Sequence, residues 1–245
     1  MPALNSAAAD RPADRPLREE LAVRRPHWPP FNRGLLITAA VFLAAALVVT
    51  LLVQLGTFRG FDRHVLTYLQ NRGSAGQDAA LGLLTYLGGI EVTLALALLV
   101  GLALFKGLRL LAIGPAVIVV LATGMEWLGK TMVHQVGPPL SAQRWPDFLP
   151  KLTHGGPPYS FPSGHVLRSV IIYGLILYLA ERWELFGKDS SRLSPVLALL
   201  VVLIGYAVLY LGWHWFADAL GGALLGLAIL IGAIAFLERR RLVKA

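Results

Sequence analysis

Long apolar runs, separated by short polar segments, dominate the chain from residue 34 onward. A helix that crosses the hydrocarbon core of a bilayer needs about 20 predominantly apolar residues. Runs of near this length predict transmembrane helices at about residues 34–56, 90–105, 109–130, 164–181, 194–212 and 214–237. The pattern therefore predicts an all-α fold, a six-transmembrane helix bundle that forms one membrane domain over residues 34–238.

Two further segments lie between the first and second predicted spans. They read FDRHVLTYLQNR and DAALGLLTYLGG, and they are too short or too polar to cross a bilayer. Such segments are typical of helices that lie in the plane of the membrane interface. We therefore expect interfacial helices between the first and second spans.

Residues 1–33 have a different composition, in which Pro, Arg and Ala dominate and no helix-length apolar run occurs. A secretory signal would place a short apolar core after a basic start, and this segment lacks such a core. We therefore expect a disordered basic cytoplasmic tail at 1–33. The last residues, 239–245, are expected to form a short basic cytoplasmic C-terminus.

The composition of the 245-residue chain agrees with a membrane protein. It is 56% hydrophobic and only 15% charged, whereas soluble domains contain about 25% charged residues. The absence of cysteine excludes disulfides, thiolate catalysis and a cysteine-based zinc site. The net charge of +8 does not indicate nucleic-acid binding, because the basic residues are concentrated at helix ends and in the N-terminal segment.

The distribution of Lys and Arg predicts the orientation in the membrane. If the N-terminus is cytoplasmic, most of the basic residues fall in cytoplasmic segments, as the positive-inside rule requires. We therefore expect a multi-pass protein of the inner (plasma) membrane with both termini in the cytoplasm. The loop 131–163 and His214 would then share the extracytoplasmic face.

The stretch Pro162-Ser163-Gly164-His165 stands directly before a predicted span. The free backbone N–H groups at a helix N-terminus attract anions, phosphate above all. Gly164 allows an anion to approach the backbone closely, and His165 follows in the first turn. The alternative is a structural helix cap formed by Ser163 with an interfacial histidine.

A second histidine, His214, stands in the stretch GWHWFAD, four residues before Asp218. Residues four apart lie on one face of a helix. A carboxylate in that position can hold one imidazole nitrogen and leave the other free to attack, as in a catalytic triad with His as the nucleophile. The alternative is a structural His–Asp pair near the start of a helix.

Lys130 ends the third predicted span on the same face of the membrane as the two histidines. Its ammonium group is suited to bind a phosphate oxygen as a point charge, or else to extend to the interface without a ligand. Glu126 lies one helical turn earlier and is placed to pair with Lys130.

Together these residues resemble the type 2 phosphatidic acid phosphatase (lipid phosphate phosphatase) family. The resemblance rests on the order Lys130, Pro138, the 162–165 stretch, His214 and Asp218, and it covers about residues 35–237. The chain is similar to a divergent member, because both arginines of the family motifs are replaced. Gly137 stands in place of the first, and Ala207-Val208 in place of the Ser-Arg pair that contains the second.

Arg168 lies three residues after His165, on the same face of the predicted fourth span. A charge inside a span needs a partner or a purpose. Our hypothesis is that Arg168 points into the pocket and replaces part of the lost positive charge. The alternative is an ion pair with Asp218 or Glu126 and no contact to a ligand.

The remaining basic candidates are weaker. Arg144 and His134, in or near the 131–163 loop, are possible substitutes for the lost arginines. No catalytic role is expected for His27 in the tail, or for His64 and His154 in polar segments.

The resemblance implies a displacement at phosphorus that needs no metal and no cofactor, although His165, His214 and Asp218 also match a two-His, one-carboxylate metal site. His214 would attack and form a phosphohistidine, Asp218 would orient it, and His165 would protonate the leaving oxygen. The expected phosphate-binding residues are Lys130, Ser163, Gly164 and Arg168.

The resemblance also implies a membrane lipid as substrate. A lipid can keep its tails in the bilayer and present only its phosphate, as in phosphatidic acid, phosphatidylglycerophosphate or a polyprenyl diphosphate. The leading interpretation is a lipid phosphatase. Headgroup phosphotransfer at the same site and an inactive lipid-binding relative are the alternatives, and the loss of both arginines favours these two.

Overall fold

The computed structural model describes residues 32–71, 73–105, 112–146, 159–182 and 190–241. This part of the chain is helical and confirms the all-α prediction. The expectations for the tail before residue 32, for His27, His154 and for residues 242–245 lie outside it. The helices are α2 (Arg33–Gln54), α3 (Arg59–Gln70), α4 (Ala75–Tyr86), α5 (Ile90–Phe105), α6 (Gly114–Met132), the 3-10 helix η3 (Leu140–Ala142), α7 (Gly164–Arg182), α8 (Ser190–Tyr210) and α9 (Phe216–Arg241).

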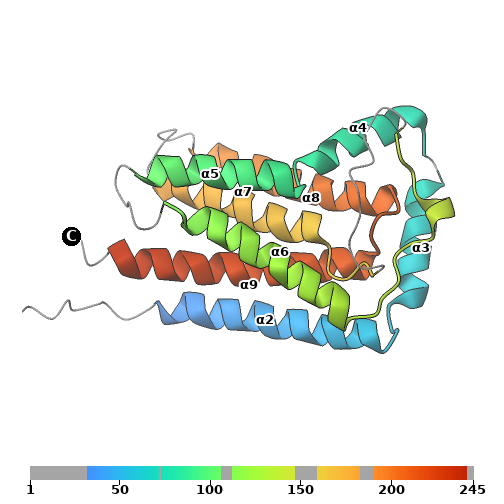
Figure 1. The fold of residues 1–245 in the computed structure, drawn as a ribbon, viewed down its shortest axis with the longest axis horizontal. Coiled ribbons are helices and arrows are strands. Elements are labelled where there is room, and N and C mark those ends of the chain that lie inside the picture. Colours follow the sequence, from blue (N-terminus) through green and yellow to red (C-terminus); the bar gives the residue numbers. More distant parts are fainter. Residues whose placement is uncertain (1–31, 72, 106–111, 147–158, 183–189, 242–245) are drawn as a thin grey trace, which may run out of the picture.

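The long helices form a bundle whose axes follow the longest dimension of the molecule (Figure 1). α2, α5, α6, α7, α8 and α9 run along this direction, whereas α3 crosses one end of the bundle and α4 leans away from it. The start of α2 and the end of α9 lie at the opposite end. Both described termini are therefore on one side of the bundle, and α3 is on the other.

Local signals define where several helices begin. Asn32 caps α2, because its side-chain oxygen accepts a hydrogen bond from the amide of Leu35 at 3.3 Å. Ser74 and Gln77 form a reciprocal capping box at the start of α4. A proline in the first turn of α6 is compatible with the helix because its missing N–H would have no intrahelical partner there.

Four helices in the described residues are long and apolar enough to cross a membrane, namely Arg33–Gln54, Gly164–Arg182, Leu193–Tyr210 and Phe216–Arg239. α4 and α5 meet at a bend of 41°, and they add a fifth span if the pair crosses as one unit. α5 alone has 16 residues, and α6 carries Glu126 and Lys130. Length and composition thus support four or five of the six spans predicted, and the segment predicted to be interfacial forms α3 and α4.

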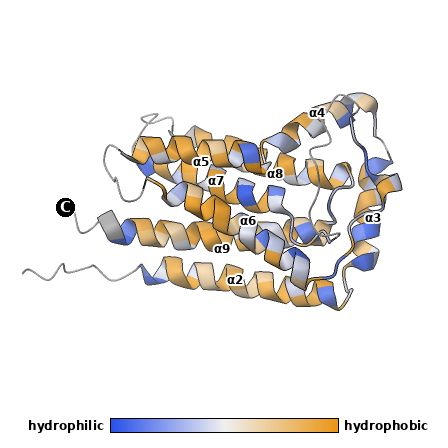
Figure 2. Ribbon diagram, viewed as in Figure 1, coloured by the Kyte–Doolittle hydropathy of each residue, from blue (hydrophilic) through white to orange (hydrophobic). Residues whose placement is uncertain are grey.

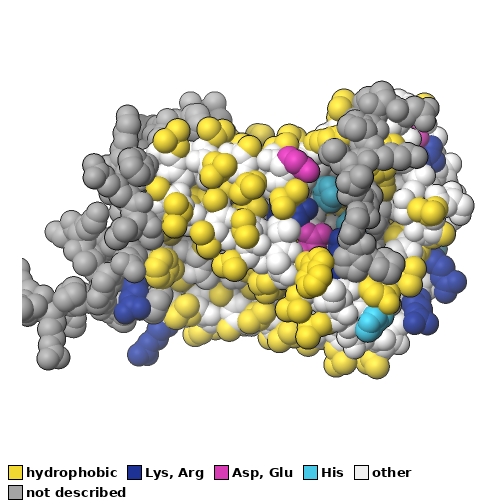
Figure 3. Space-filling model, in the orientation of Figure 1, with side chains coloured by type: hydrophobic (Ala, Val, Ile, Leu, Met, Phe, Trp, Pro, Cys, Tyr) yellow, Lys and Arg dark blue, Asp and Glu magenta, His cyan; other side chains and the backbone are white. Residues whose placement is uncertain are grey.

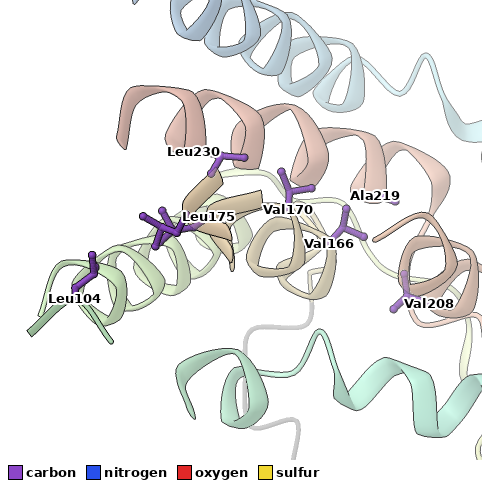
Figure 4. Close-up of a cluster of buried hydrophobic side chains, with 8 residues drawn as sticks. Leu104, Val166, Val170, Leu175, Val208, Ala219 and Leu230 are labelled. Atoms are coloured by element: carbon purple, nitrogen blue, oxygen red, sulfur yellow. The ribbon is translucent and has the colours of Figure 1, made fainter. Parts of the chain in front are cut away.

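α7 is the central helix of the bundle. Of its apolar stretch 67% is buried, against 17% for α2, which packs on α9 at the periphery. Figure 4 shows one buried cluster around α7. In it, Val166 and Val170 of α7 point toward α9, which contributes Ala219 and Leu230. Val208 of α8 belongs to the same cluster and is fully buried.

Close contact between α7 and α9 depends on small residues. A Cβ at Gly222 would collide with the backbone oxygen of Ser163, so this position has room for glycine alone. The sequence GGALLG of α9 thus lets the start of α7 approach its backbone, as expected for small residues in membrane helices. This approach brings the 162–165 turn next to Asp218.

Hydropathy varies along the bundle in a way that places the polar chemistry. Apolar residues dominate the long helices, and hydrophilic residues are concentrated around α3 and at the neighbouring ends of α6, α7 and α9 (Figure 2). The space-filling view shows acidic, basic and histidine side chains close together where they interrupt the hydrophobic surface (Figure 3).

Candidate active site

The turn Pro162-Ser163-Gly164 is joined to the start of α9. The amide of Ser163 donates a hydrogen bond to the backbone oxygen of Asp218 at 2.9 Å. The hydroxyl oxygen of Ser163 is fully buried and has no hydrogen-bond partner in the described structure. A buried polar atom without a partner is unusual in proteins. It lies at the N-terminus of α7, where an anion is favoured.

Asp218 is held by neutral donors in addition to His214. It is completely buried. Its Oδ2 accepts a hydrogen bond from the amide of Trp215 at 2.8 Å, and its Oδ1 accepts one from the side-chain amide of Gln135 at 3.0 Å. Nδ1 of His214 lies 3.4 Å from Oδ2. The predicted pair is present, with the carboxylate on the Nδ1 side of the ring. The expectation that both residues share one helical face was wrong, because α9 begins at Phe216 and His214 lies in the turn before it.

The two histidines come from different parts of the chain, and their rings meet edge to face. The ring centroids of His165, in the first turn of α7, and His214, just before α9, are 6.3 Å apart with an angle of 61° between the planes. Nε2 of His214 has no hydrogen-bond partner in the part of the chain that is described. Trp213 lies beside His165 at 6.0 Å and stacks on Trp145 at 4.5 Å. The histidine pair thus has an aromatic wall.

Glu126 lies between two cations. Its Oε1 accepts a hydrogen bond from Nζ of Lys130 at 2.8 Å, and its Oε2 accepts one from Nη1 of Arg168. A Cβ at Gly164 would collide with the same carboxylate. The Glu126 carboxylate therefore lies against the start of α7. Arg168 is buried, and its Nε has no partner among the described residues.

The residues predicted from the sequence are brought together by these contacts. A chain of neighbours runs from Lys130 and Arg168 through Glu126 to the start of α7, and from there to the His–Asp pair. Of the two alternatives for Arg168, the ion pair with Glu126 is present in the structure. Its capacity to bind phosphate remains a proposal.

The weaker basic candidates have other positions. Nε of Arg144 pairs with Asp78 of α4 at 2.8 Å, and its guanidinium lies over the ring of Tyr210. This arrangement ties the loop to α4 and α8. His134 is exposed and contacts the edge of Tyr159.

Two residues of the site were missed by sequence reasoning. Gln135, in the loop after α6, binds Asp218 across 83 positions of sequence. Asp62 of α3 is buried, and its Oδ1 accepts a hydrogen bond from the amide of Ala217 in the first turn of α9 at 3.0 Å. In the sequence, Asp62 is one of several polar residues of an amphipathic segment. That pattern does not show whether its side chain lies on the buried or on the exposed side of the helix.

The electrostatic environment of Asp62 is affected by the site. The pKa of its carboxyl is raised to about 6, chiefly by burial and to a smaller extent by the charge of Asp218, against the lowering effect of the hydrogen bond from Ala217. No three acidic or histidine side chains in the described structure form a metal-binding group.

A family model described as the PAP2 superfamily matches residues 108–242, which include all of these residues except Asp62. The chain belongs to the PAP2 superfamily. Among curated proteins it is similar to phosphatidylglycerophosphatase B of Bacillus subtilis (strain 168), with 36% identity over 85 residues. That match spans 34% of this chain and 41% of the relative, less than half of its length.

The fold is also similar to a solved structure. A crystal structure of a transmembrane PAP2 type phosphatidylglycerolphosphate phosphatase from Bacillus subtilis superposes with a TM-score of 0.70 at 21% identity. The similarity covers 82% of this chain and 96% of the solved one. This PAP2 superfamily member is therefore a multi-pass membrane protein with the transmembrane fold of that structure.

Proposed function

We propose that this protein is a membrane lipid phosphatase that removes a terminal phosphate from a lipid through a phosphohistidine. The observation that carries the proposal is the pairing of two imidazoles, 6.3 Å apart, with a buried carboxylate behind one of them. Membership of the PAP2 superfamily and the similarity to phosphatidylglycerophosphatase B support it.

In the proposed first step, Nε2 of His214 attacks phosphorus and the bond from phosphorus to the lipid oxygen breaks. Asp218 accepts a hydrogen bond from Nδ1–H of His214, which fixes the tautomer in which Nε2 is unprotonated, and it stabilises the positive charge that develops on the ring. His165 donates a proton to the departing oxygen. In this proposal the phosphoryl oxygens are bound by Nε–H of Arg168 and the buried Ser163 hydroxyl, which have no partner among the described residues, and by Lys130, which pairs with Glu126.

In the second step, water attacks the phosphohistidine and the bond between phosphorus and nitrogen breaks. His165, now unprotonated, accepts a proton from that water. The products are inorganic phosphate and a neutral His214. The same intermediate would yield a new phosphate ester if an alcohol replaced water.

Headgroup phosphotransfer is kept as the second candidate because of two positions in the family pattern. Gly137 and Val208 stand where the motifs that the chain resembles have arginine. Val208 is enclosed in the hydrophobic cluster of α7, α8 and α9, so that part of the site is apolar. A site with less positive charge holds a phosphoryl group less tightly. This weakens the argument for hydrolysis and leaves headgroup phosphotransfer as the alternative.

The proposed setting is the outer side of an inner membrane, with six helices that cross it. α5 and α6 run beside the longer helices (Figure 1) and complete this arrangement. The start of α2 and the end of α9 lie at the end of the bundle opposite α3, in keeping with termini on the cytoplasmic side. The site would then open where lipid headgroups of the outer leaflet lie.

The test is a product assay with the full chain in detergent or nanodiscs. Phosphatidic acid, phosphatidylglycerophosphate and a polyprenyl diphosphate are offered in turn, and inorganic phosphate and lipid products are measured together. Phosphate release that disappears in His214→Ala, but not in the exposed control His64→Ala, supports the phosphatase. A new phospholipid without free phosphate supports the transferase, and no turnover of any lipid would contradict both.

A further inference from the structure

A cavity lies beside the candidate active site and is lined by neither of its histidines. It has a volume of about 600 Å³ and lies between the end of α2, the start of α3 and the loop after α6. This volume is within the range of small-molecule sites, about 300–1,000 Å³. Its lining includes Arg59, Asp62, Arg63, His134, Gln135 and Trp215.

The charge of the cavity favours an anion. Arg59 and Arg63 lie one helical turn apart on α3, and neither has a carboxylate partner among the residues that the structure describes. Asp62 is turned toward α9, where its Oδ1 accepts the hydrogen bond from Ala217. Two guanidinium groups on one cavity are suited to the oxygens of a phosphate.

The backbone at Gly56 allows Arg59 to take this position. Gly56 has a φ of 73°, which favours glycine, and a Cβ there would approach Nε of Arg59 to 2.8 Å. The Arg59 side chain thus folds back over the turn between α2 and α3. Glycine in this turn is needed both for the conformation and for the space that the guanidinium occupies.

The surroundings of the cavity are apolar and exposed, which indicates a lipid. Val136, which lines the cavity, is 67% exposed, and Leu55, Phe61 and Met132, which lie within two residues of lining positions in the sequence, have exposed fractions from 51% to 70%. They surround the end of α2, a helix long and apolar enough to cross the membrane. A cationic cavity at the end of a spanning helix, bordered by exposed apolar side chains, fits a headgroup whose acyl chains remain in the bilayer.

We propose that this cavity binds the phosphodiester headgroup of an anionic glycerophospholipid, at a site separate from the His165–His214 pair. The bound lipid touches the active site through Gln135 and Trp215, which line the cavity and both donate hydrogen bonds to Asp218. The site is thus an accessory lipid site next to the catalytic carboxylate. It does not depend on which reaction the histidines perform.

The first test is lipid retention by the full chain in native mass spectrometry, with phosphatidylglycerol and phosphatidylcholine as probes. Arg59→Gln/Arg63→Gln should weaken phosphatidylglycerol retention about tenfold, as expected for the loss of two interfacial charges. Arg33→Gln/Arg182→Gln removes two exposed charges elsewhere and should leave retention unchanged. Equal losses in the two double variants, or no loss in the first, would overturn the proposal.

The second test needs no removal of charge and uses the absence of cysteine from the chain. In His134→Cys the new thiol lies in the cavity, and in Leu140→Cys it is exposed outside it. Phosphatidylglycerol nanodiscs should slow maleimide labelling at position 134 about threefold or more relative to phosphatidylcholine nanodiscs, and not at position 140. Equal protection by inorganic phosphate in phosphatidylcholine nanodiscs would overturn the assignment to a lipid.

Both readouts are binding measurements. A protein that binds phosphatidylglycerol at this cavity yet turns over no lipid would refute the proposed phosphatase and support the accessory site. If the protein releases phosphate from lipids but the two double variants retain lipid equally, the phosphatase is supported and the accessory site is refuted.

Discussion

Two carboxylates of the candidate site, Asp218 and Glu126, have contrasting surroundings. Asp218 accepts hydrogen bonds from a backbone amide and from the neutral Gln135, and His214 is the ionisable side chain in contact with its carboxylate. Glu126 contacts two cations, Lys130 and Arg168. The charge of Asp218 is therefore oriented without being neutralised, whereas the charge of Glu126 is already compensated.

This difference separates two tasks that a phosphoryl-transfer site must perform. An oriented carboxylate without a permanent cation can stabilise an imidazolium that forms during the reaction. A carboxylate shared by two cations reduces the positive charge available to a substrate phosphate. We infer that the His214 side of the site is organised for attack and that the Glu126 side limits how tightly phosphate is held.

The largest effect is expected from the two histidines, whose roles can be separated. His214→Gln should lower turnover by at least about 10⁴-fold and abolish the labelled phosphoenzyme, because no nucleophile remains. His165→Gln should still form phosphoenzyme from p-nitrophenyl phosphate, whose leaving group needs no protonation. Rapid quench with a labelled substrate measures the intermediate, and labelling that persists in His214→Gln would refute this assignment.

The next effect concerns the orienting carboxylate. Asp218→Asn should remove the charge and leave one acceptor oxygen in place of two, and turnover should fall by about 10³-fold with little change in KM. Steady-state kinetics on one lipid measure the two parameters. If KM alone rises in the variant, Asp218 acts in substrate binding. The proposed division between an orienting Asp218 and a charge-compensating Glu126 would then be wrong.

Most of this arrangement follows from short sequence spacing. Glu126 and Lys130 are four residues apart on α6, so their pairing was predictable from the helical period. His214 has the same spacing from Asp218, but it lies in the turn before α9, so the pair forms at the start of the helix and not along its face. The contact of Arg168 with Glu126 joins α7 to α6, and the sequence offered it only as one of two alternatives. The span predicted around Glu126 and Lys130 was the hardest to place, because two charges interrupt its apolar run.

Contacts that depend on loop conformation escaped prediction. Gln135 reaches Asp218 because the loop after α6 is fixed by a hydrogen bond from the amide of Ser160 to the Gln135 oxygen and by one from the Trp215 indole to Val136. No period in the sequence encodes such pairings. Asp62 was missed for a related reason, since the packing of α3 across the start of α9 decides which of its polar residues is buried.

A moderate effect is expected when the compensated carboxylate loses its charge. Glu126→Gln should free Lys130 and Arg168 for phosphate, and inhibition by inorganic phosphate should strengthen about tenfold. Arg168→Leu should weaken that inhibition. The exposed Glu91→Gln is the matched control, for which no change is expected. Unchanged inhibition in both Glu126→Gln and Arg168→Leu would exclude this side of the site from phosphate binding.

The smallest effect is expected at Asp62, which joins the accessory cavity to the start of α9. Because its pKa in the folded protein is raised to about 6, above a reference value of about 3.9, the folded state binds the proton more tightly than the unfolded state. This contribution to stability is fully present below about pH 4 and is lost as the pH rises toward 6.

Asp62→Asn keeps an oxygen that can accept the hydrogen bond from Ala217 and removes the titration. The melting temperature of the variant should therefore rise relative to that of the wild type as the pH increases from 4 to 7, by a few degrees at most. Thermal unfolding of both proteins in the same detergent measures the difference. A difference that stays constant over this range would show that the carboxyl of Asp62 titrates alike in the folded and unfolded states, and that Asp218 exerts no detectable charge effect across the start of α9.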